Sequence, residues 1–327
     1  MGSRAAKSVV KHQELAAALA EHAAPAQHDD PMAEAGRKLM LAEFLRMLAE
    51  EDGARVGEDI EHVHNMRVAI RRMRSVFKLL GNYYQPRTIR PYRRGLRAVM
   101  QALGEVRDLD VMIHDLQAFL PQMPPEQVGA MQSVVDSLDQ RRAVARAELS
   151  KVLDSKRYRR LCRDFGAFLT TPEAGASAPP GAQVVPNQVR HAAPPLICQR
   201  LAEVRAYDVV LPTDSAPTLH QLRITFKALR YTVSLFDGLL GAEAAGFISE
   251  LKAIQDHLGR LNDIAVAHER LGLLMADLEG DQCAALWVYL EHLDVERPAL
   301  IEQFPAVWKR FNSKPVQRKL ALAMLHL

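Results

Sequence analysis

Apolar residues recur every three or four positions through most of the chain, and no segment keeps up a strict alternation of apolar and polar residues. A period of three to four is typical of amphipathic α-helices, whereas alternation would indicate strands. The sequence therefore predicts an all-α fold. The expected helices cover residues 34–51, 58–80, a long stretch from the prolines at 86 and 91 to residue 119, 126–153, 157–169, 196–209, 216–239 and 242–274, with two or three more after these.

Proline, glycine and small residues divide this helical pattern into parts. Residues 1–30 are rich in alanine with scattered charges, and we expect a poorly ordered N-terminal tail there. Residues 171–195 are rich in Pro, Gly and Ala, a composition typical of a flexible linker. The predicted domains are thus an N-terminal helical subdomain over 31–170 and a C-terminal helical subdomain over 196–327.

A basic stripe led by histidine occurs twice, on two of the predicted helices. His64 is followed by Arg67, Arg71 and Arg74, and 156 residues later His220 is followed by Arg223, Lys227 and Arg230. In a helix of 3.6 residues per turn, these four positions fall within about 80° of one face. Apolar residues such as Met66, Ile70, Met73 and Phe77 fall on a separate arc. Each helix therefore buries one face and offers a cationic one, and two such helices favour a groove for a polyanion.

A second motif also repeats, now with an offset of 155 residues. Leu103-Gly104-Glu-Val-Arg107-Asp108-Leu-Asp110 corresponds to Leu258-Gly259-Arg-Leu-Asn262-Asp263-Ile-Ala, and Arg97 aligns with Lys252. A repeat of this length indicates an internal duplication of a whole helical subdomain rather than a solenoid of short units. Gly104 and Gly259 are the positions where two helices could approach closely.

Charge is distributed unevenly, although the net charge is only +3. Between His62 and Arg107 there are eleven Lys or Arg residues and one acid, Glu105. Many of the compensating acids lie in the preceding segment, between residues 34 and 61. Such a separation produces a local positive field that concentrates anions near one surface.

Arginine is well suited to bind phosphate, because its planar guanidinium donates two parallel hydrogen bonds and stays charged. Lysine adds a point charge, and histidine donates from a ring nitrogen, more strongly when protonated. We read Asp108, Asn262 and Asp263 as groups that orient the arginines, with simple surface positions as the alternative. The predicted phosphate-binding residues are His64, Arg67, Arg71, Arg72, Arg74, Lys78, Arg93, Arg97, Arg107, His220, Arg223, Lys227, Arg230, Tyr231 and Lys252.

These paired motifs resemble the CHAD family, whose name denotes a helical domain with a characteristic histidine. The resemblance covers roughly residues 31–327. It implies two pseudo-symmetric helical bundles around a basic groove that binds inorganic polyphosphate. It also implies no catalysis, so we expect no catalytic residue, no metal site and no cofactor. The Glu-x-Glu-x-Lys motif of the metalloenzyme domain fused to some members is absent from this sequence.

Two other functions remain open at this stage. Nucleic acid would satisfy the same phosphate contacts, but single-stranded binders usually add stacking aromatics, and aromatic residues make up only 6% of this chain. Nucleic acid is therefore a secondary partner in our interpretation. His114-Asp115 resembles the doublet of metal-dependent phosphohydrolases, yet such a site needs several convergent ligands. Adjacent helical residues diverge by about 100°.

Location is predicted from what the sequence lacks. The three cysteines are scattered and form no motif, which favours a reducing compartment. No apolar run is long enough to span a membrane, and charges interrupt the first thirty residues. We expect a cytoplasmic protein, either free or on polyphosphate granules, and the sequence leaves its oligomeric state open.

Overall fold

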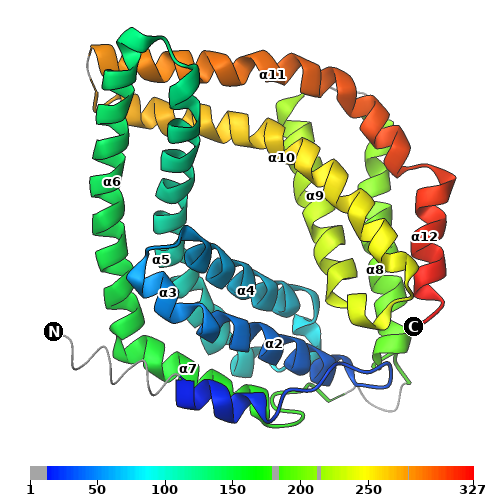
Figure 1. Ribbon diagram of the computed structural model, residues 1–327. Coiled ribbons are helices and arrows are strands. Elements are labelled where there is room, and N and C mark those ends of the chain that lie inside the picture. Colours follow the sequence, from blue (N-terminus) through cyan, green and yellow to red (C-terminus); the bar gives the residue numbers. More distant parts are fainter. Residues whose placement is uncertain (1–12, 179–183, 212–214, 279) are drawn as a thin grey trace. The chain divides into compact units, whose positions relative to one another are not determined.

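The computed structural model describes residues 13–178, 184–211, 215–278 and 280–327, and no β-strand lies within them. The predicted all-α fold is confirmed. Its helices are shown in Figure 1. They are α2 (Met32–Ala49), α3 (Glu51–Val56), α4 (Ile60–Leu79), α5 (Pro86–Phe119), α6 (Pro125–Asp154), α7 (Lys156–Thr170), α8 (Val189–Arg205), α9 (Ala216–Leu235), α10 (Glu243–Met275), α11 (Asp281–Phe311) and α12 (Lys314–Met324).

The chain divides into two compact units, and the division falls within α5 and α6. Unit 1 comprises Met1–His114 with Ser137–Val189, and unit 2 comprises Asp115–Asp136 with Arg190–Leu327. The sequence had assigned all of 31–170 to the N-terminal subdomain, whereas residues 115–136 group with the C-terminal helices. Aromatic packing explains this grouping, because the Phe119 ring lies 5.1 Å from that of Tyr289 and 4.6 Å from that of His292.

In unit 1, α4 runs beside α2, and α7 also packs on α2 (Figure 1). Asp59 begins α4 by accepting a hydrogen bond from the backbone N–H of Glu61, which satisfies a donor that the helix leaves unpaired. Aromatic rings fill the interface, with Phe165 of α7 lying 5.2 Å from Phe44 of α2 and 6.1 Å from Phe77 of α4. The residues that α4 buries are Val63, Met66, Ala69, Ile70, Met73, Val76 and Phe77.

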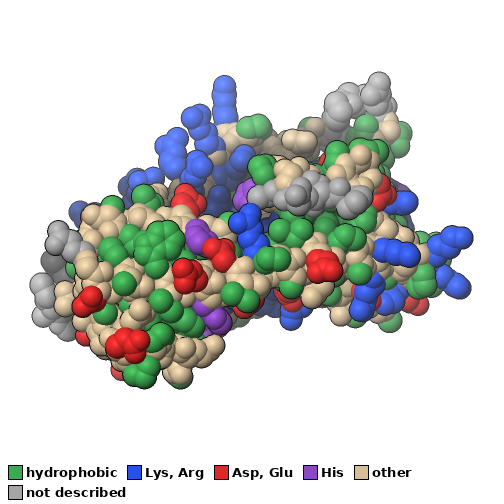
Figure 2. Space-filling view, turned by 90° about the horizontal axis from the view of Figure 1, so that it is seen from above, with side chains coloured by type: hydrophobic (Ala, Val, Ile, Leu, Met, Phe, Trp, Pro, Cys, Tyr) green, Lys and Arg blue, Asp and Glu red, His purple; other side chains and the backbone are tan. Residues whose placement is uncertain are grey.

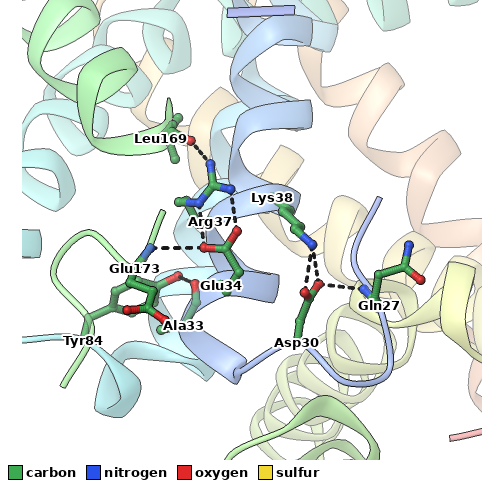
Figure 3. Close-up of polar contacts among 9 residues, drawn as sticks. All are labelled: Gln27, Asp30, Ala33, Glu34, Arg37, Lys38, Tyr84, Leu169 and Glu173. Carbon is green, nitrogen blue, oxygen red and sulfur yellow. Dashed lines mark hydrogen bonds and ion pairs between the residues drawn. The ribbon is translucent and has the colours of Figure 1, made fainter. Parts of the chain in front are cut away.

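A buried arginine joins α2 to the chain that follows α7 (Figure 3). Arg37 is only 6% exposed, and its guanidinium donates to the carboxylate of Glu34 and to the backbone carbonyl of Leu169. Glu34 also accepts a hydrogen bond from the backbone N–H of Glu173. The Arg37 hydrogen bond holds the pKa of Glu34 below its usual value, against the opposing effect of partial burial. This network joins α2 to the end of α7 and to the residues that follow it.

In unit 2, α10 packs against α9, α11 and α12. Phe226 of α9 lies 4.9 Å from Phe311 and 6.0 Å from Trp308, ring centre to ring centre, and all three side chains are buried. The Trp308 indole N–H donates to Asp208, so its polar atom is satisfied as well. The buried side of α9 therefore faces these aromatic residues and leaves its other side to the surface.

Parts of the segment predicted as a flexible linker make backbone hydrogen bonds to unit 1 or belong to helix α8. Residues 179–183 lie outside the described part of the chain. On either side, the Ser177 N–H donates to the Tyr83 carbonyl, and the Val189 N–H donates to the Asp30 carbonyl. Helix α8 begins at Val189 instead of 196. Burial of Val189, Ala193 and Ile197 explains this earlier start, because their apolar faces pack despite the prolines at 194 and 195.

The expected N-terminal tail is also partly ordered. Residues 13–20 are helical and Leu19 is 3% exposed. The reason is packing against α7, where Gly166 leaves room for Leu19, since a Cβ there would lie 3.3 Å from the leucine. The remainder of the expected tail, residues 1–12, lies outside the described residues.

Candidate functional site

The basic stripe of α4 lies on the side of the helix opposite its buried arc. His64, Arg67 and Arg71 are half-buried, and Arg74 and Lys78 are exposed. The stripe is graded along the helix, from partly enclosed at the histidine to open at the lysine. Because the apolar arc anchors the helix, the cationic side chains are held on a fixed scaffold instead of on a loop.

Arg72 departs from the stripe. At about 100° per residue it lies well away from the line joining His64 and Arg71. Its guanidinium donates to the Glu43 carboxylate of α2 across 3.0 Å. This predicted phosphate ligand therefore has an acid partner within the protein, and its free charge toward a ligand is reduced.

Burial lowers the pKa of the His64 imidazole, and the charge of Arg107 lowers it further. Arg71 and Arg67 add smaller effects in the same direction, whereas Glu61 raises the pKa. Loss of solvent around the ring is thus the main cause of the lowered pKa, and the three guanidinium groups add to it. The neutral form is thus favoured while no anion is near.

Helix α5 supplies the next row of cations in unit 1. Arg93 and Arg97 are exposed, and Arg107 is half-buried with its Nη1 atom 3.7 Å from Glu61.

Gly104 of α5 has a definite role, since a Cβ at this position would lie 2.8 Å from the Arg67 guanidinium. The glycine therefore makes room for an arginine side chain that crosses α5, rather than for a helix backbone. At Gly259, by contrast, a Cβ would meet no described atom within 4 Å.

Asp110, an acid of this motif that the sequence analysis did not select, contacts two arginines. Its side chain is buried, at 1% exposed, and one carboxylate oxygen lies 3.4 Å from both Arg142 and Arg146 of α6. Burial raises the Asp110 pKa, and the neighbouring arginines partly offset that rise. The signal in the sequence was Arg142 and Arg146 spaced four apart on one helix face. Asp108, which was selected, is half-buried.

Several guanidinium atoms around the two stripes are buried without an acceptor. Within the described residues, Arg71 Nε, Arg107 Nη1 and Arg223 Nε have almost no solvent contact and no hydrogen-bond partner. Buried donors are usually paired in folded proteins, so an unpaired group marks a position with a further role. Arg71 and Arg223 belong to the two basic stripes and Arg107 lies on α5, while Arg146 Nε and Arg200 Nε are unpaired outside the stripes.

In unit 2, α9 carries the second stripe. Arg223, Lys227 and Arg230 are half-buried, and His220 is exposed. The Arg230 guanidinium carbon lies 5.6 Å from the centre of the Tyr231 ring, a cation–π distance that fixes this arginine against its neighbour. A separate arc of the helix is again buried, with Leu222, Phe226, Leu229 and Val233 inside.

On α10, Asn262 orients the leading histidine of this second stripe. The Nδ1 atom of His220 lies 3.0 Å from the Asn262 side-chain oxygen. With its Nδ1 hydrogen donated to Asn262, the ring directs its other nitrogen away from α10. Lys252 and Asp263 are exposed on the same helix, and no described contact joins Asp263 to an arginine of the stripe.

A pocket of about 330 Å³ opens beside His220, and every residue lining it belongs to unit 2. Its walls come from α9, α10 and α11. Apolar side chains form most of them, and polar groups lie among them: His220, Asn262, His268, Asp294 and Arg297. The His268 Nε2 atom lies 3.0 Å from Asp294, although the angle is unsuitable for a hydrogen bond.

His114 and Asp115, the alternative metal doublet, are both exposed. The charge of Asp115 acts on Arg260 and Tyr289 of unit 2. Within the described residues, no group of three or more His, Cys, Asp or Glu side chains is arranged to hold a metal ion. The doublet thus has a nearby guanidinium as its electrostatic partner.

One face of the molecule, drawn in Figure 2, illustrates the uneven charge distribution. In this view Lys and Arg side chains gather in clusters, whereas acidic and His side chains are scattered among hydrophobic ones. None of the helices in the described ranges combines the length and the apolar character needed to cross a bilayer.

The model of the CHAD domain family matches residues 38–272, which is most of the chain and includes both basic stripes. The chain belongs to the CHAD domain family. This membership confirms the resemblance drawn from the paired motifs. The matched range includes the first histidine stripe, the pocket residues of α9 and α10, and the Leu-Gly motifs of both halves.

Two solved structures share the fold of this CHAD domain. The crystal structure of the CHAD domain from the plant Ricinus communis has a TM-score of 0.64 and 23% identity, covering 93% of this chain and 95% of that one. PptA from Streptomyces chartreusis also has a TM-score of 0.64, with 15% identity, covering 86% of this chain and 100% of that one. No curated protein matches the chain.

Proposed function

We propose that this CHAD domain binds inorganic polyphosphate through the basic stripes of α4 and α9, extended by Arg97 on α5 and Lys252 on α10. The observation that carries the proposal is that both helices have the same basic stripe of a histidine, an arginine and further cations. Each basic stripe lies on a different side of its helix from the buried arc. Each also includes a buried guanidinium nitrogen that has no acceptor among the described residues.

The length of the basic stripe on α4 favours a linear polyanion over a single phosphate. His64 and Lys78 are fourteen residues apart on one helix, a distance of about 21 Å at 1.5 Å per residue. A chain of phosphates places a charge beside each successive cation, and each arginine donates paired hydrogen bonds to it. Binding of this kind needs neither turnover nor a metal, and it would recruit the protein to polyphosphate granules.

Nucleic acid would use the same cations, so it serves as the competitor in the test. Arg230 covers the Tyr231 ring in the second stripe, which leaves that ring poorly placed to stack on a base. Phe77 and Phe226 are buried in the two cores. Recognition therefore rests on phosphate groups rather than on bases.

Charge reversal tests the proposal. Arg71→Glu, Lys227→Glu and the double variant are titrated with polyphosphate of defined lengths by calorimetry. Each lost charge-assisted contact is worth about 1.5–3 kcal/mol at most, and repulsion adds to it, so we expect the double variant to bind at least about 100-fold more weakly. If one chain engages both stripes, long chains lose affinity in either single variant, and short chains lose less.

The matched control is Arg159→Glu with Arg318→Glu. These exposed residues lie on α7 and α12, helices that carry no residue of either stripe, and the change in net charge is the same. We expect this control to retain most of the affinity. Equal binding by the stripe variant and the wild type would contradict the proposal, as would RNA that competes more strongly than polyphosphate of equal charge.

A further inference from the structure

The pocket of unit 2 occupies the position that corresponds to the buried acid of unit 1. The offset of 155 residues that relates the two Leu-Gly motifs also relates α6 to α11, where Leu138-Asp139-x-x-Arg142 corresponds to Leu293-Asp294-x-x-Arg297. The bounds of these helices, Pro125–Asp154 and Asp281–Phe311, agree with that offset to within two residues. The two sites can therefore be compared position by position.

The comparison shows what opens the pocket. Asp110 and Arg146, which contact each other in unit 1, correspond to Ala265 and Ile301, which both line the pocket of unit 2. An aspartate and a long arginine are thus replaced by a methyl group and a shorter apolar side chain. The place that an ion pair occupies in unit 1 thus corresponds in unit 2 to part of the wall of an open pocket of about 330 Å³.

One cation persists while one of its two acid partners, Asp110, is lost, and the counterpart of the other, Asp294, lies 3.0 Å from His268. In unit 1, Arg142 is shared between Asp110 and Asp139. Its counterpart Arg297 lines the pocket, and within the described residues it makes no ion pair. An arginine that keeps its position but has no acid partner is suited to bind an anionic or strongly polar group of a ligand.

The lining determines what kind of ligand fits. Leu219, Leu258, Leu261, Ile264 and Ile301 provide apolar walls, while the amide of Asn262 and the carboxylate of Asp294 offer hydrogen-bonding groups. A saturated chain would leave those polar groups unpaired, which is costly. A nucleobase offers apolar faces together with donors and acceptors at its edges, and the pocket volume is within the usual range of about 300–1,000 Å³ for ligand sites.

The pocket also adjoins the second basic stripe. His220 lines it, and Arg223 lies one turn further along the same face of α9. We propose that unit 2 binds a nucleoside triphosphate, with the base in the pocket and the phosphates along His220, Arg223 and Lys227. This inference rests on the anion-binding role proposed for the α9 stripe, and it assigns to unit 2 a ligand that unit 1 cannot accept.

Calorimetry of the full chain with ATP, tripolyphosphate and adenosine tests the proposal, in buffer with a chelator so that the nucleotide is free of metal. ATP and tripolyphosphate share the phosphate contacts but only ATP has a base. We expect ATP to bind about tenfold more tightly than tripolyphosphate, because burial of the ring adds to the phosphate contacts after ordering costs are met. Adenosine alone should bind more weakly than ATP.

Two variants locate the ATP site. Ala265→Asp combined with Ile301→Arg rebuilds the ion pair of unit 1 without changing the net charge, and should reduce ATP binding to the level of tripolyphosphate. Ala265→Leu fills the pocket with a single apolar side chain and should have the same effect, so the test survives if the double variant fails to fold. The control is Ala245→Leu, the same substitution at an exposed position of α10 outside the pocket.

The outcomes separate this proposal from the one on which it rests. Tripolyphosphate that binds as tightly as ATP overturns the pocket assignment and leaves polyphosphate binding intact. So does an Ala265→Leu variant that binds ATP as the wild type does. If the wild type binds neither tripolyphosphate nor longer polyphosphate, the proposed function fails as well.

Discussion

At the scale of single residues, His64 links anion binding to pH. Burial and the adjacent Arg107 lower its pKa from the usual 6.5. Protonation of His64 therefore reduces the stability of the folded protein as pH falls below about 6.5. A phosphate chain beside the ring reverses this effect and raises the pKa, and binding then takes up a proton. We therefore expect polyphosphate affinity to increase from about pH 8 to about pH 6, by about tenfold for each unit by which the pKa rises.

The comparison that checks this prediction uses His64→Gln and His62→Gln. His62 lies on the same helix but pairs with Glu50 across 2.8 Å, outside the stripe. Calorimetry with long chains avoids the titration of terminal phosphates. The His64 variant should lose part of the pH dependence, and the His62 variant should keep it. Identical pH profiles for all three proteins would show that His64 does not contact the polyanion.

At the scale of elements, two buried carboxylates join helices in different ways. Glu51 of α3 accepts hydrogen bonds from Arg55 at 2.7 Å and from the Tyr158 hydroxyl of α7 at 2.6 Å. Asp110 of α5 lies at the longer distance of 3.4 Å from its two arginines, and burial raises its pKa. A raised pKa means that the charged form of Asp110 costs folding stability, which therefore decreases as pH rises through its pKa.

Neutral isosteres should separate the two cases. Glu51→Gln should lower the free energy of unfolding by about 3 kcal/mol, since it breaks a closely paired buried charge. Asp110→Asn should stay within about 1 kcal/mol of the wild type at neutral pH, because burial already disfavours the charged form of Asp110 and its contacts with the two arginines are long. Urea unfolding measures both. A large loss in the Asp110 variant would mean that the charge itself holds α6 on α5.

At the scale of the whole molecule, a net charge of +3 conceals strongly basic stretches. Several phosphate contacts should make the binding affinity fall steeply as the salt concentration rises. By analogy with single-stranded nucleic acids, the logarithm of the binding constant should fall by about 0.7 per contact for each tenfold rise in salt. We expect Arg71→Ala to reduce that slope by roughly one contact. Titrations at several salt concentrations test this, and an affinity that does not change with salt would favour a buried uncharged ligand.

The duplication also belongs to this scale. Helices α4 and α9 span Ile60–Leu79 and Ala216–Leu235, so both of their bounds differ by the 156 residues that separate the two stripes. Agreement at both ends supports the interpretation that two helical subdomains share one ancestor. The two halves differ in their chemistry, because Arg107 in one corresponds to Asn262 in the other, and Asn262 orients His220.

The sequence by itself determined the helices, their buried arcs and the two basic stripes. These features depend on residues within a few turns of one another, so periodicity and spacing are sufficient to predict them. Met66, Ile70 and Met73 are fully buried, and His64 and Arg71 lie on the other side of the helix, as the pattern indicated.

Only the tertiary structure decided which distant groups meet. It turned Arg72 toward Glu43, paired Asp110 with arginines of α6, and grouped residues 115–136 with the C-terminal helices. It also opened a pocket that Ala265 and Ile301 line. The reason is that such contacts depend on the angles and distances at which whole helices pack, which many residues set jointly and no local pattern encodes.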